Sequence, residues 1–174
     1  MKENIKNYWI ISDTHFNHIK LDEWGERSGD WQTTIWMGLD CIPKGDILIH
    51  LGDIAIGNDQ EVHKLISALQ CKKILIRGNH DKKSANWYLN NGWDFVCDGL
   101  DLLFQGYYLF LSHRPIPTFS HYNYNIHGHT HGNLHRSEEY VSYYDKNYHK
   151  DISPELVGYI PLRLDTFIKS FTKK

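Results

Sequence analysis

Short, continuously apolar segments along the chain predict buried β-strands. Each is a few residues long, is rich in β-branched or aromatic side chains, and lacks the alternation of apolar and polar residues that marks a half-exposed strand. Continuous apolarity of this kind is typical of strands that are covered on both faces. The segments are residues 8–11, 47–51, 74–76, 107–111 and 124–126.

Amphipathic helices are predicted between the first of these strands. Apolar side chains recur every three or four positions over residues 31–42, with Asp30 as the expected N-cap, and again over residues 62–69 and 85–89. Up to about residue 95 the chain therefore alternates strand and helix. That order favours parallel strands joined by right-handed crossovers.

The second half of the chain has a different pattern. Helical periodicity fades after Asp94, and short apolar segments predict strands over residues 95–97, 100–104 and 140–144, several of them antiparallel. Residues 164–171 are predicted to form a closing helix. Because no linker or repeat interrupts the sequence, we expect one α/β domain over residues 1–174, built on two sheets.

Composition and charge narrow the class of protein. With 41% hydrophobic and 23% charged residues, the chain is typical of a folded globular domain and not of a disordered one. A net charge of -2 argues against a nonspecific nucleic-acid binder, which would carry a basic excess. The sequence also lacks the apolar run of ~18 residues that a membrane-spanning helix requires.

The cysteines indicate a reducing compartment. Cys41, Cys71 and Cys97 are odd in number and widely spaced, which is typical of free thiols. Residues 1–7 lack the apolar core of a secretion signal. We therefore expect a cytoplasmic location and no membrane partner.

Residue types that bind metals follow each of the five apolar segments. In open α/β sheets the carboxyl ends of the strands form the ligand crevice, so we expect these residues on one rim. Asp13 and His15 are two positions apart, as are His129 and His131, and in extended backbone each pair could hold one ion together. The candidate ligands are Asp13, His15, Asp53, Asn79, His113, His129 and His131.

The types of donor atom limit which metal ions the site is suited to bind. Two carboxylates, one amide oxygen and four imidazoles, with no thiolate, suit Mn, Fe, Zn, Ni or Co better than Ca or Cu(I). Seven side chains are too many for one tetrahedral ion. We therefore expect two divalent transition-metal ions that share one carboxylate, with manganese as the first choice.

The ordered motifs resemble those of the calcineurin-like metallophosphoesterase superfamily, and the segment 12–18 resembles its small bacterial and phage-type branch. The resemblance implies a four-layer α/β/β/α sandwich of two mixed sheets. The motifs span residues 13–131 in the expected order. They are Asp13-x-His15, Gly52-Asp53, Gly78-Asn79-His80-Asp81, His113 and Gly128-His129-Thr130-His131.

The resemblance also implies which residue does what. The first metal ion would be held by Asp13, His15 and His131, and the second by Asn79, His113 and His129. Asp53 would bridge both ions, and His80 would contact phosphate and act as the acid.

The implied reaction is hydrolysis of a phosphate monoester or diester. A hydroxide that the metals generate would attack phosphorus in line, and protonated His80 would donate to the leaving alkoxide.

One motif departs from the protein-phosphatase branch. There the second motif continues with an aspartate and an arginine, but here Ile56 and Gly57 stand at those places. The departure argues against a phosphoprotein phosphatase. It leaves Asp81 as a candidate to orient His80, and Arg114 and His18 as candidates to bind substrate.

Two other functions remain open. A nuclease or nucleic-acid-end phosphatase would use the same chemistry but needs a basic groove, and the sequence offers only the lysine pairs 72–73, 82–83 and 173–174. A non-catalytic protein-binding scaffold would be expected to have lost ligands, and none of the seven is lost. The expected partner is a small phosphate ester, and the oligomeric state stays open.

The remaining histidines are expected to have structural or surface roles. His50 lies inside a strand, where we expect it to pack in the core or to orient a ligand. His63, His121, His135 and His149 are expected at the surface.

Overall fold

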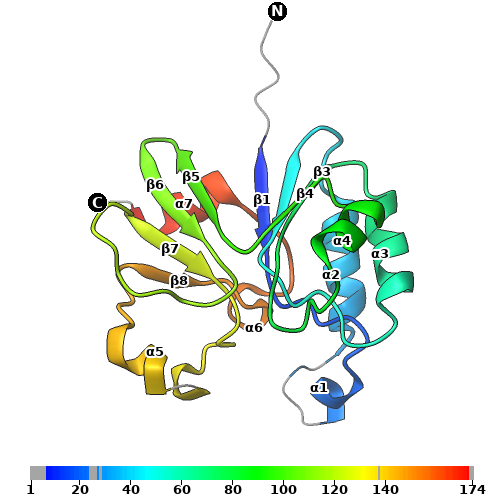
Figure 1. The fold of residues 1–174 in the computed structure, drawn as a ribbon, viewed down its shortest axis with the longest axis horizontal. Helices are drawn as coiled ribbons and strands as arrows, with labels where there is room; N and C mark the ends of the chain where they lie inside the picture. Colours follow the sequence, from blue (N-terminus) through cyan, green and yellow to red (C-terminus); the bar gives the residue numbers. More distant parts are fainter. Residues whose placement is uncertain (1–6, 24–26, 28, 137, 173–174) are drawn as a thin grey trace, which may run out of the picture.

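Two β-sheets lie face to face at the centre of the fold (Figure 1). The strand order is β4-β3-β2-β1-β9 in the first sheet and β5-β6-β7-β8 in the second. The computed structural model describes residues 7–23, 27, 29–136 and 138–172. The expectation that the chain lacks a secretion signal rests mainly on residues 1–6, which lie outside the described residues. The lysine pair 173–174 lies outside them as well.

The first sheet contains the strands predicted in the first half of the chain. Its four parallel strands are joined in register, with Tyr8 beside Ile47 and Ile49 beside Ile74. A short strand from the end of the chain, β9, adds an antiparallel edge beside β1. The strands are β1 (Tyr8–Ile11), β2 (Ile47–His50), β3 (Lys72–Ile76), β4 (Phe95–Cys97) and β9 (Leu162–Arg163).

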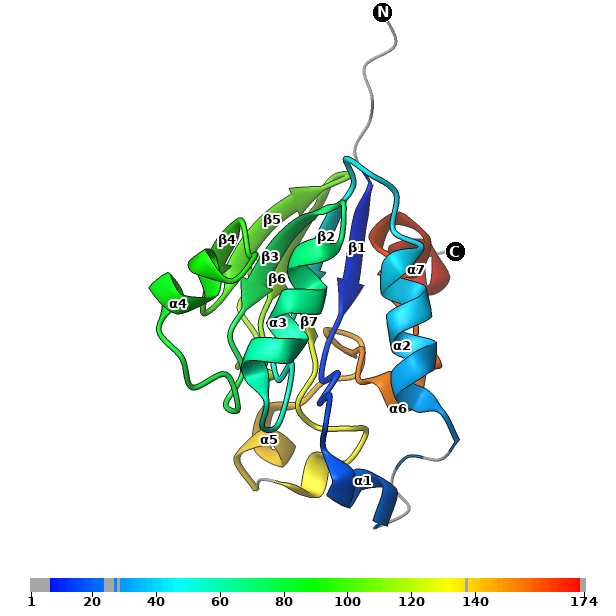
Figure 2. The same cartoon turned by 90° about the vertical axis from the view of Figure 1, so that its right-hand side faces the viewer.

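Three helices cover the outer face of the first sheet, as the apolar spacing predicts (Figure 2). The Asp30 side chain caps the first of them by accepting a 3.3 Å hydrogen bond from the backbone N–H of Thr33. Trp31, Ile35 and Leu39 lie on its buried face, one or two helical turns apart. The helices are α2 (Trp31–Asp40), α3 (Asp59–Ala68) and α4 (Ala85–Asn90).

The second sheet packs its inner face on the first sheet. Leu109, Leu111 and Ile126 meet Ile10 and Ile49 in a second buried core. Of the segments for which antiparallel pairing was expected, residues 100–104 pair antiparallel with residues 107–111, but residues 95–97 pair parallel with β3 in the first sheet, so the expectation was wrong there. The strands are β5 (Leu100–Phe104), β6 (Tyr107–Leu111), β7 (Tyr124–His127) and β8 (His149–Asp151), and the predicted closing helix is α7 (Leu164–Thr172).

The predicted strand over residues 140–144 was wrong. This segment belongs to helix α5 (Glu138–Tyr143), in which Tyr140 and Tyr143 are one helical turn apart and Tyr140 is buried. Aromatic residues favour strands in general, but the spacing of these tyrosines is also compatible with a helix, and tertiary packing decided the outcome. Five short elements were not predicted: α1 (Ile19–Glu23), the 3-10 turn η1 (Leu134–Arg136), β8, α6 (Pro154–Val157) and β9.

The two-sheet α/β sandwich is confirmed, with a thin fourth layer. Asn125 and His149 point away from the core-facing Ile126. Asn125 Oδ1 accepts a hydrogen bond from the N–H of Ile116, and His149 Nε2 donates to the Ile116 carbonyl. Helix α5 and this segment therefore cover part of the outer face of the second sheet.

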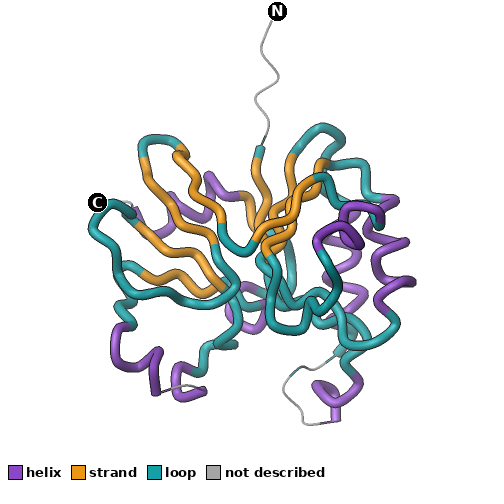
Figure 3. The backbone as a smooth tube through the Cα atoms, in the orientation of Figure 1, coloured by secondary structure: helices purple, strands orange, loops and turns teal. Residues whose placement is uncertain are grey.

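The loops after the strands meet at one end of the molecule. The chain that leaves β1 leads directly into α1, and α1 and α5 lie at the same end (Figures 2 and 3). The three cysteines are unpaired, as expected. No helix in the described part of the chain is long and apolar enough to cross a bilayer.

Candidate metal centre

Five of the predicted ligands share an unusual backbone conformation. Their φ angles are positive, in the left-handed region, where residues other than glycine are usually strained. Strained residues of this kind cluster at functional sites. Hydrogen bonds between loops hold the conformation: the N–H of Asp13 donates to Gly52 O at 2.9 Å, and that of His15 donates to Asp53 O at 3.0 Å. The five φ angles are 49° for Asp13, 45° for His15, 57° for Asp53, 68° for His129 and 50° for His131.

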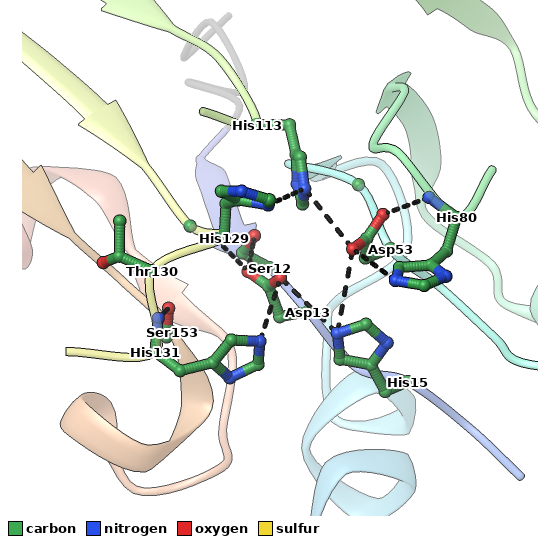
Figure 4. A network of polar contacts seen from close by, with 12 residues as sticks. Ser12, Asp13, His15, Asp53, His80, His113, His129, Thr130, His131 and Ser153 are labelled. Carbon is green, nitrogen blue, oxygen red and sulfur yellow. Dashed lines mark hydrogen bonds and ion pairs between the residues drawn. The ribbon is translucent and has the colours of Figure 1, made fainter. Parts of the chain in front are cut away.

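The first cluster of donors brings together Asp13, His15 and His131 (Figure 4). Their ligand atoms all lie within 4.8 Å of one another. The Nε2 atoms of His15 and His131 are each 3.6 Å from Asp13 Oδ1. All three residues come from loops that follow strands, as the sequence predicts.

The second cluster brings together Asp53, His113 and His129, again within 4.8 Å. His113 donates its Nδ1 proton to Leu51 O at 2.8 Å, which turns its Nε2 atom toward the cluster. That Nε2 lies 3.0 Å from Asn79 Oδ1 and 3.1 Å from His129 Nδ1, so Asn79 joins this group.

The expectation that His129 and His131 would hold one ion as a pair was wrong. His131 lies in the first cluster and His129 in the second. That expectation assumed an extended backbone, whereas both residues have positive φ angles, 68° and 50°. The turn therefore directs the two rings to different clusters.

Asp53 lies between the two clusters. Its Oδ2 atom is 3.8 Å from His15 Nε2 on one side and 3.4 Å from His113 Nε2 on the other. Its Oδ1 atom accepts a 2.7 Å hydrogen bond from the backbone N–H of His80. One carboxylate oxygen is thus fixed by the main chain, and the other faces both groups of ligands.

The carboxylates are held in their charged form by the histidines around them. Burial raises the pKa of Asp13, but His15, His113 and His131 outweigh it and hold that pKa well below its usual range. Burial raises the pKa of Asp53 in the same way, and the hydrogen bond and charge of His113 lower it below its ordinary value.

The two histidines of the second cluster have opposite pKa shifts. Burial lowers the pKa of His113, but Asp53 and Asp13 outweigh it, so the pKa rises to about 9. Burial, together with the charges of His113 and Arg114, lowers the pKa of His129 to about 4. The protonated His113 ring can therefore donate from Nε2 toward a neutral His129.

Asp81 supports the Asp53 loop and does not orient His80. Its carboxylate accepts hydrogen bonds from the backbone N–H groups of Gly78 at 2.7 Å, Asp53 at 2.8 Å and Ile54 at 3.2 Å. The candidate pairing of Asp81 with the His80 ring is therefore wrong, since both carboxylate oxygens are directed to the main chain of this loop.

Two glycines allow the carboxylates to approach the backbone. A Cβ atom at Gly78 would overlap Oδ1 of Asp53, and one at Gly128 would overlap Oδ2 of Asp13 and Oγ of Ser12. Glycine, which has no Cβ atom, therefore lets the backbone come close to both carboxylates.

His50 is a buried neutral residue that joins two ligand loops. Its Nδ1 accepts a 3.1 Å hydrogen bond from the N–H of Gly52. Thr14 Oγ1 donates to Ile54 O at 2.9 Å, so at 3.0 Å it accepts from the Nε2–H of His50. Burial lowers the pKa of His50 to about 3, which keeps the ring neutral. The expectation of a core histidine is confirmed, and its hydrogen bonds reach the neighbours of Asp13 and Asp53 and not a candidate ligand itself.

The candidate acid and the substrate-binding candidates lie around the clusters. The His80 side chain is 45% exposed, and its Nε2 is 3.9 Å from Asp53 Oδ2. The ring of His18 stands edge-on to that of His15, with centroids 5.8 Å apart. Arg114 is exposed and lines an open cleft of about 380 Å³ together with Asn79 and His113.

Sequence reasoning missed two charged residues at this site, the buried Arg27 and the partly buried Glu155. Arg27 donates from Nε to Glu155 Oε1 at 2.6 Å, and the same oxygen is 3.0 Å from His131 Nδ1. Neither residue belongs to a motif, and 128 positions separate them, so no local pattern could have indicated the pair.

The expectation of surface histidines was wrong at two positions. His63 is 1% exposed and accepts a 2.9 Å hydrogen bond from the indole N–H of Trp93. His149 is 2% exposed and stacks on the ring of Tyr144. His121 and His135 are exposed as expected.

The donors present fit divalent metal ions. Asp13 Oδ1 and His15 Nδ1 are buried and have no hydrogen-bond partner among the described residues. An unsatisfied buried carboxylate oxygen is costly unless something else binds it. Because each cluster mixes carboxylate and imidazole without thiolate, each could hold a transition-metal ion.

Known proteins of similar sequence or fold were found in two kinds of organism. The chain is 27% identical over 180 residues to an uncharacterized protein of Methanocaldococcus jannaschii, covering 98% of this chain and 94% of that one. A protein of unknown function from Aquifex aeolicus has the same fold, with a TM-score of 0.74 at 23% identity over 95% of this chain and 99% of its own. An archaeal phosphodiesterase is less similar, with a TM-score of 0.49 at 19% identity over 85% of this chain and 82% of its own.

The decisive comparison is with a family. The sequence profile of the calcineurin-like phosphoesterases matches residues 6–158, which include every predicted ligand. This chain belongs to the calcineurin-like phosphoesterase family.

Proposed function

We propose that this chain is a phosphoesterase that uses two divalent transition-metal ions to hydrolyse a phosphate monoester or diester. The observation that carries the proposal is the position of Asp53 Oδ2, 3.8 Å from His15 Nε2 and 3.4 Å from His113 Nε2. A carboxylate that faces two donor clusters is suited to bridge two ions, and two-metal sites are a recurrent way to hydrolyse phosphate esters.

Each ion has its own set of ligands in this proposal. Bound there, the ions would supply a hydroxide nucleophile at neutral pH and positive charge toward the phosphoryl oxygens. We expect manganese, while Fe, Zn, Ni or Co would suit the same donors. The first set is Asp13, His15 and His131, the second is Asn79, His113 and His129, and Asp53 belongs to both.

His80 is the general acid of the proposed reaction. Its main chain is fixed by the hydrogen bond to Asp53 Oδ1, and its ring is half-exposed beside Asp53 Oδ2. A ring in that position can reach a leaving oxygen in the mouth of the site without being a ligand itself. Protonated His80 would donate to the alkoxide as the ester bond breaks.

The substrate would enter through the cleft beside the second cluster. The Arg114 guanidinium is placed there to bind phosphate oxygens, and Phe110 and Ile116 offer apolar contacts to the organic group of the ester. His18 would contact substrate from the side of His15. Because Gly57 stands where protein phosphatases have an arginine, we favour diesters over monoesters.

The contacts of Lys72 and Lys73 favour a small substrate over duplex nucleic acid. Lys72 is paired with Asp94 at 2.7 Å, and the ammonium of Lys73 donates to the carbonyls of Leu69 and Cys71. These two charges are therefore engaged away from the ligand clusters and do not form a groove for a duplex. We propose that one domain over residues 1–174 acts in the cytoplasm, in keeping with its free cysteines.

An activity panel with Mn²⁺-loaded protein tests the proposal. The panel contains a nitrophenyl phosphate monoester, the matching diester, cyclic nucleotides and end-phosphorylated oligonucleotides. We expect metal-dependent hydrolysis of the diester, lost in His113→Ala and retained in His121→Ala, a control at an exposed histidine. Preference for the oligonucleotide ends would favour the end-phosphatase alternative. No turnover of any ester by protein that holds its ions would favour a scaffold and contradict the proposal.

A further inference from the structure

An ion pair between buried Arg27 and partly buried Glu155 lies beside the first ligand cluster. Glu155, in α6, accepts hydrogen bonds at one oxygen, Oε1, from Arg27 Nε at 2.6 Å and from His131 Nδ1 at 3.0 Å. Arg27 is only 2% exposed, and its guanidinium also stacks over the ring of Trp31, 4.6 Å from the centroid. A buried guanidinium whose carboxylate partner also contacts a ligand histidine calls for an explanation beyond surface solubility.

We propose that Arg27 and Glu155 form a positioning pair for the first metal ion. This inference rests on the proposed function. In the neutral ring of His131, Nδ1 carries the proton that it donates to Glu155, so Nε2, 3.6 Å from Asp13 Oδ1, is the nitrogen that carries the lone pair. A carboxylate that accepts from the far nitrogen of a ligand histidine fixes its tautomer and ring orientation and makes it a stronger ligand.

Arg27 acts on the other two ligands of the same cluster. Its guanidinium donates to the carbonyl of Asp13 at 2.7 Å and to that of Thr14 at 3.1 Å. These carbonyls belong to the turn in which Asp13 and His15 have positive φ angles, 49° and 45°. The guanidinium therefore links the strained turn that presents Asp13 and His15 to the carboxylate that orients His131.

The pair reaches the first cluster only. In the described part of the chain, neither Arg27 nor Glu155 hydrogen bonds to Asn79, His113 or His129. Glu155 is the member of the pair that contacts a ligand side chain, His131. Its loss should weaken one ion and leave the other bound.

Titration of the metal-free protein with Mn²⁺ tests the inference without any measurement of activity. Glu155→Ala should bind the first ion about 10–100-fold more weakly and the second within about twofold of the wild type. Glu155→Gln keeps an acceptor oxygen opposite His131 Nδ1 and should restore most of the affinity that alanine loses. A role limited to neutralising Arg27 would instead make glutamine as damaging as alanine.

Three further variants complete the experiment. Asn79→Ala should weaken the second ion, so the double variant with Glu155→Ala should hold neither ion tightly. Glu155→Asp keeps the negative charge but draws the shared oxygen back from both His131 and Arg27, so it should also weaken the first ion and decides the question if Glu155→Ala does not fold. The control is Asp165→Ala: Asp165 lies on α7 and pairs with Arg163 of β9, so this variant should bind both ions as the wild type does.

The outcomes separate this inference from the proposed function. If the wild type binds two ions and both Glu155→Ala and Glu155→Asp bind them with unchanged affinity, the positioning role is overturned and the two-metal function stands. If the wild type binds one ion, the proposed function is overturned together with the inference that rests on it. Weakening of both ions to the same degree would also overturn a role confined to the first site.

Discussion

The backbone N–H of His80 donates a 2.7 Å hydrogen bond to Oδ1 of Asp53. This bond occupies one oxygen of the carboxylate and leaves Oδ2 facing both ligand clusters. It also fixes the main chain from which the His80 ring projects. A single interaction therefore sets the orientation of the proposed bridge and of the proposed acid.

Asp53→Ala should harm activity more than His15→Ala. Asp53 is a proposed ligand of both ions and His15 of one, so the first change should reduce binding of both ions and the second of one. The loss of affinity should exceed the ~10–100-fold that removal of an outer partner of a ligand typically costs. Turnover and bound Mn²⁺ per chain measure the difference. Near-normal turnover with two bound ions in Asp53→Ala would refute the bridge.

His80→Ala should lower turnover by ~10²–10⁴-fold while both ions stay bound. The ring is half-exposed and is 3.9 Å from Asp53 Oδ2, so its removal takes away an acid and not a ligand. The loss should be smaller for a nitrophenyl ester, whose leaving group needs little protonation. Turnover of nitrophenyl and alkyl esters should be compared. Equal losses for both would indicate that His80 binds substrate instead.

The ligand set could be predicted because each ligand follows a recognisable strand. Asp13 and Asp53, for example, come within three residues of β1 and β2, and parallel strands bring such positions to one edge. Gly78, within a motif, lets the backbone come close to the Asp53 carboxylate. Local pattern and global fold agree here, so the sequence was sufficient to predict that these candidate ligands lie together, although not that His129 and His131 belong to different clusters.

The supports of the site could not be predicted in the same way. The contact of Glu155 with Arg27 joins residues 128 positions apart, and it exists only because α6 packs beside the turn after β1. His63 lies next to Val62 on α3. Because histidine is not one of the apolar residues whose spacing predicts this helix, the sequence does not indicate that His63 is buried. Interactions that depend on tertiary packing produce no periodic pattern of residues in the sequence.

Stability of the metal-free protein should fall as pH drops from about 6.5 toward about 4. Burial lowers the pKa of His63 from 6.5 to about 4, so in this window the unfolded chain takes up a proton that the folded chain refuses. The contribution is fully present above the unfolded pKa and is lost as pH falls to the folded one, up to about 3 kcal/mol.

The His63→Leu variant isolates this effect. It removes the titrating group, along with the hydrogen bond from Trp93, so it should be less stable at pH 7 but less sensitive to acid. Urea midpoints at pH 7 and 4.5, in the presence of a chelator, measure both quantities. If the two proteins lose the same free energy of unfolding between these pH values, His63 is not a source of the acid sensitivity.

Binding to duplex DNA should be weak and only slightly dependent on salt. The net charge is -2, and Lys72 is already paired with Asp94. Each phosphate contact would add about -0.9 to the slope of log affinity against log salt, so contact with the scissile phosphate alone predicts a slope near -1. Binding measured across a salt series tests this. Tight binding with a steep slope would support the nuclease alternative.

The central claim is that Asp53 is shared by two metal ions, and metal stoichiometry tests it most directly. Protein stripped with a chelator and dialysed against Mn²⁺ should retain two ions per chain by elemental analysis, falling to about one in His131→Ala and in Asn79→Ala. Coupling between neighbouring ions should be visible in the Mn²⁺ paramagnetic resonance spectrum of the wild type and absent in both variants. A wild-type stoichiometry of one ion, with all seven ligand side chains intact, would contradict the account.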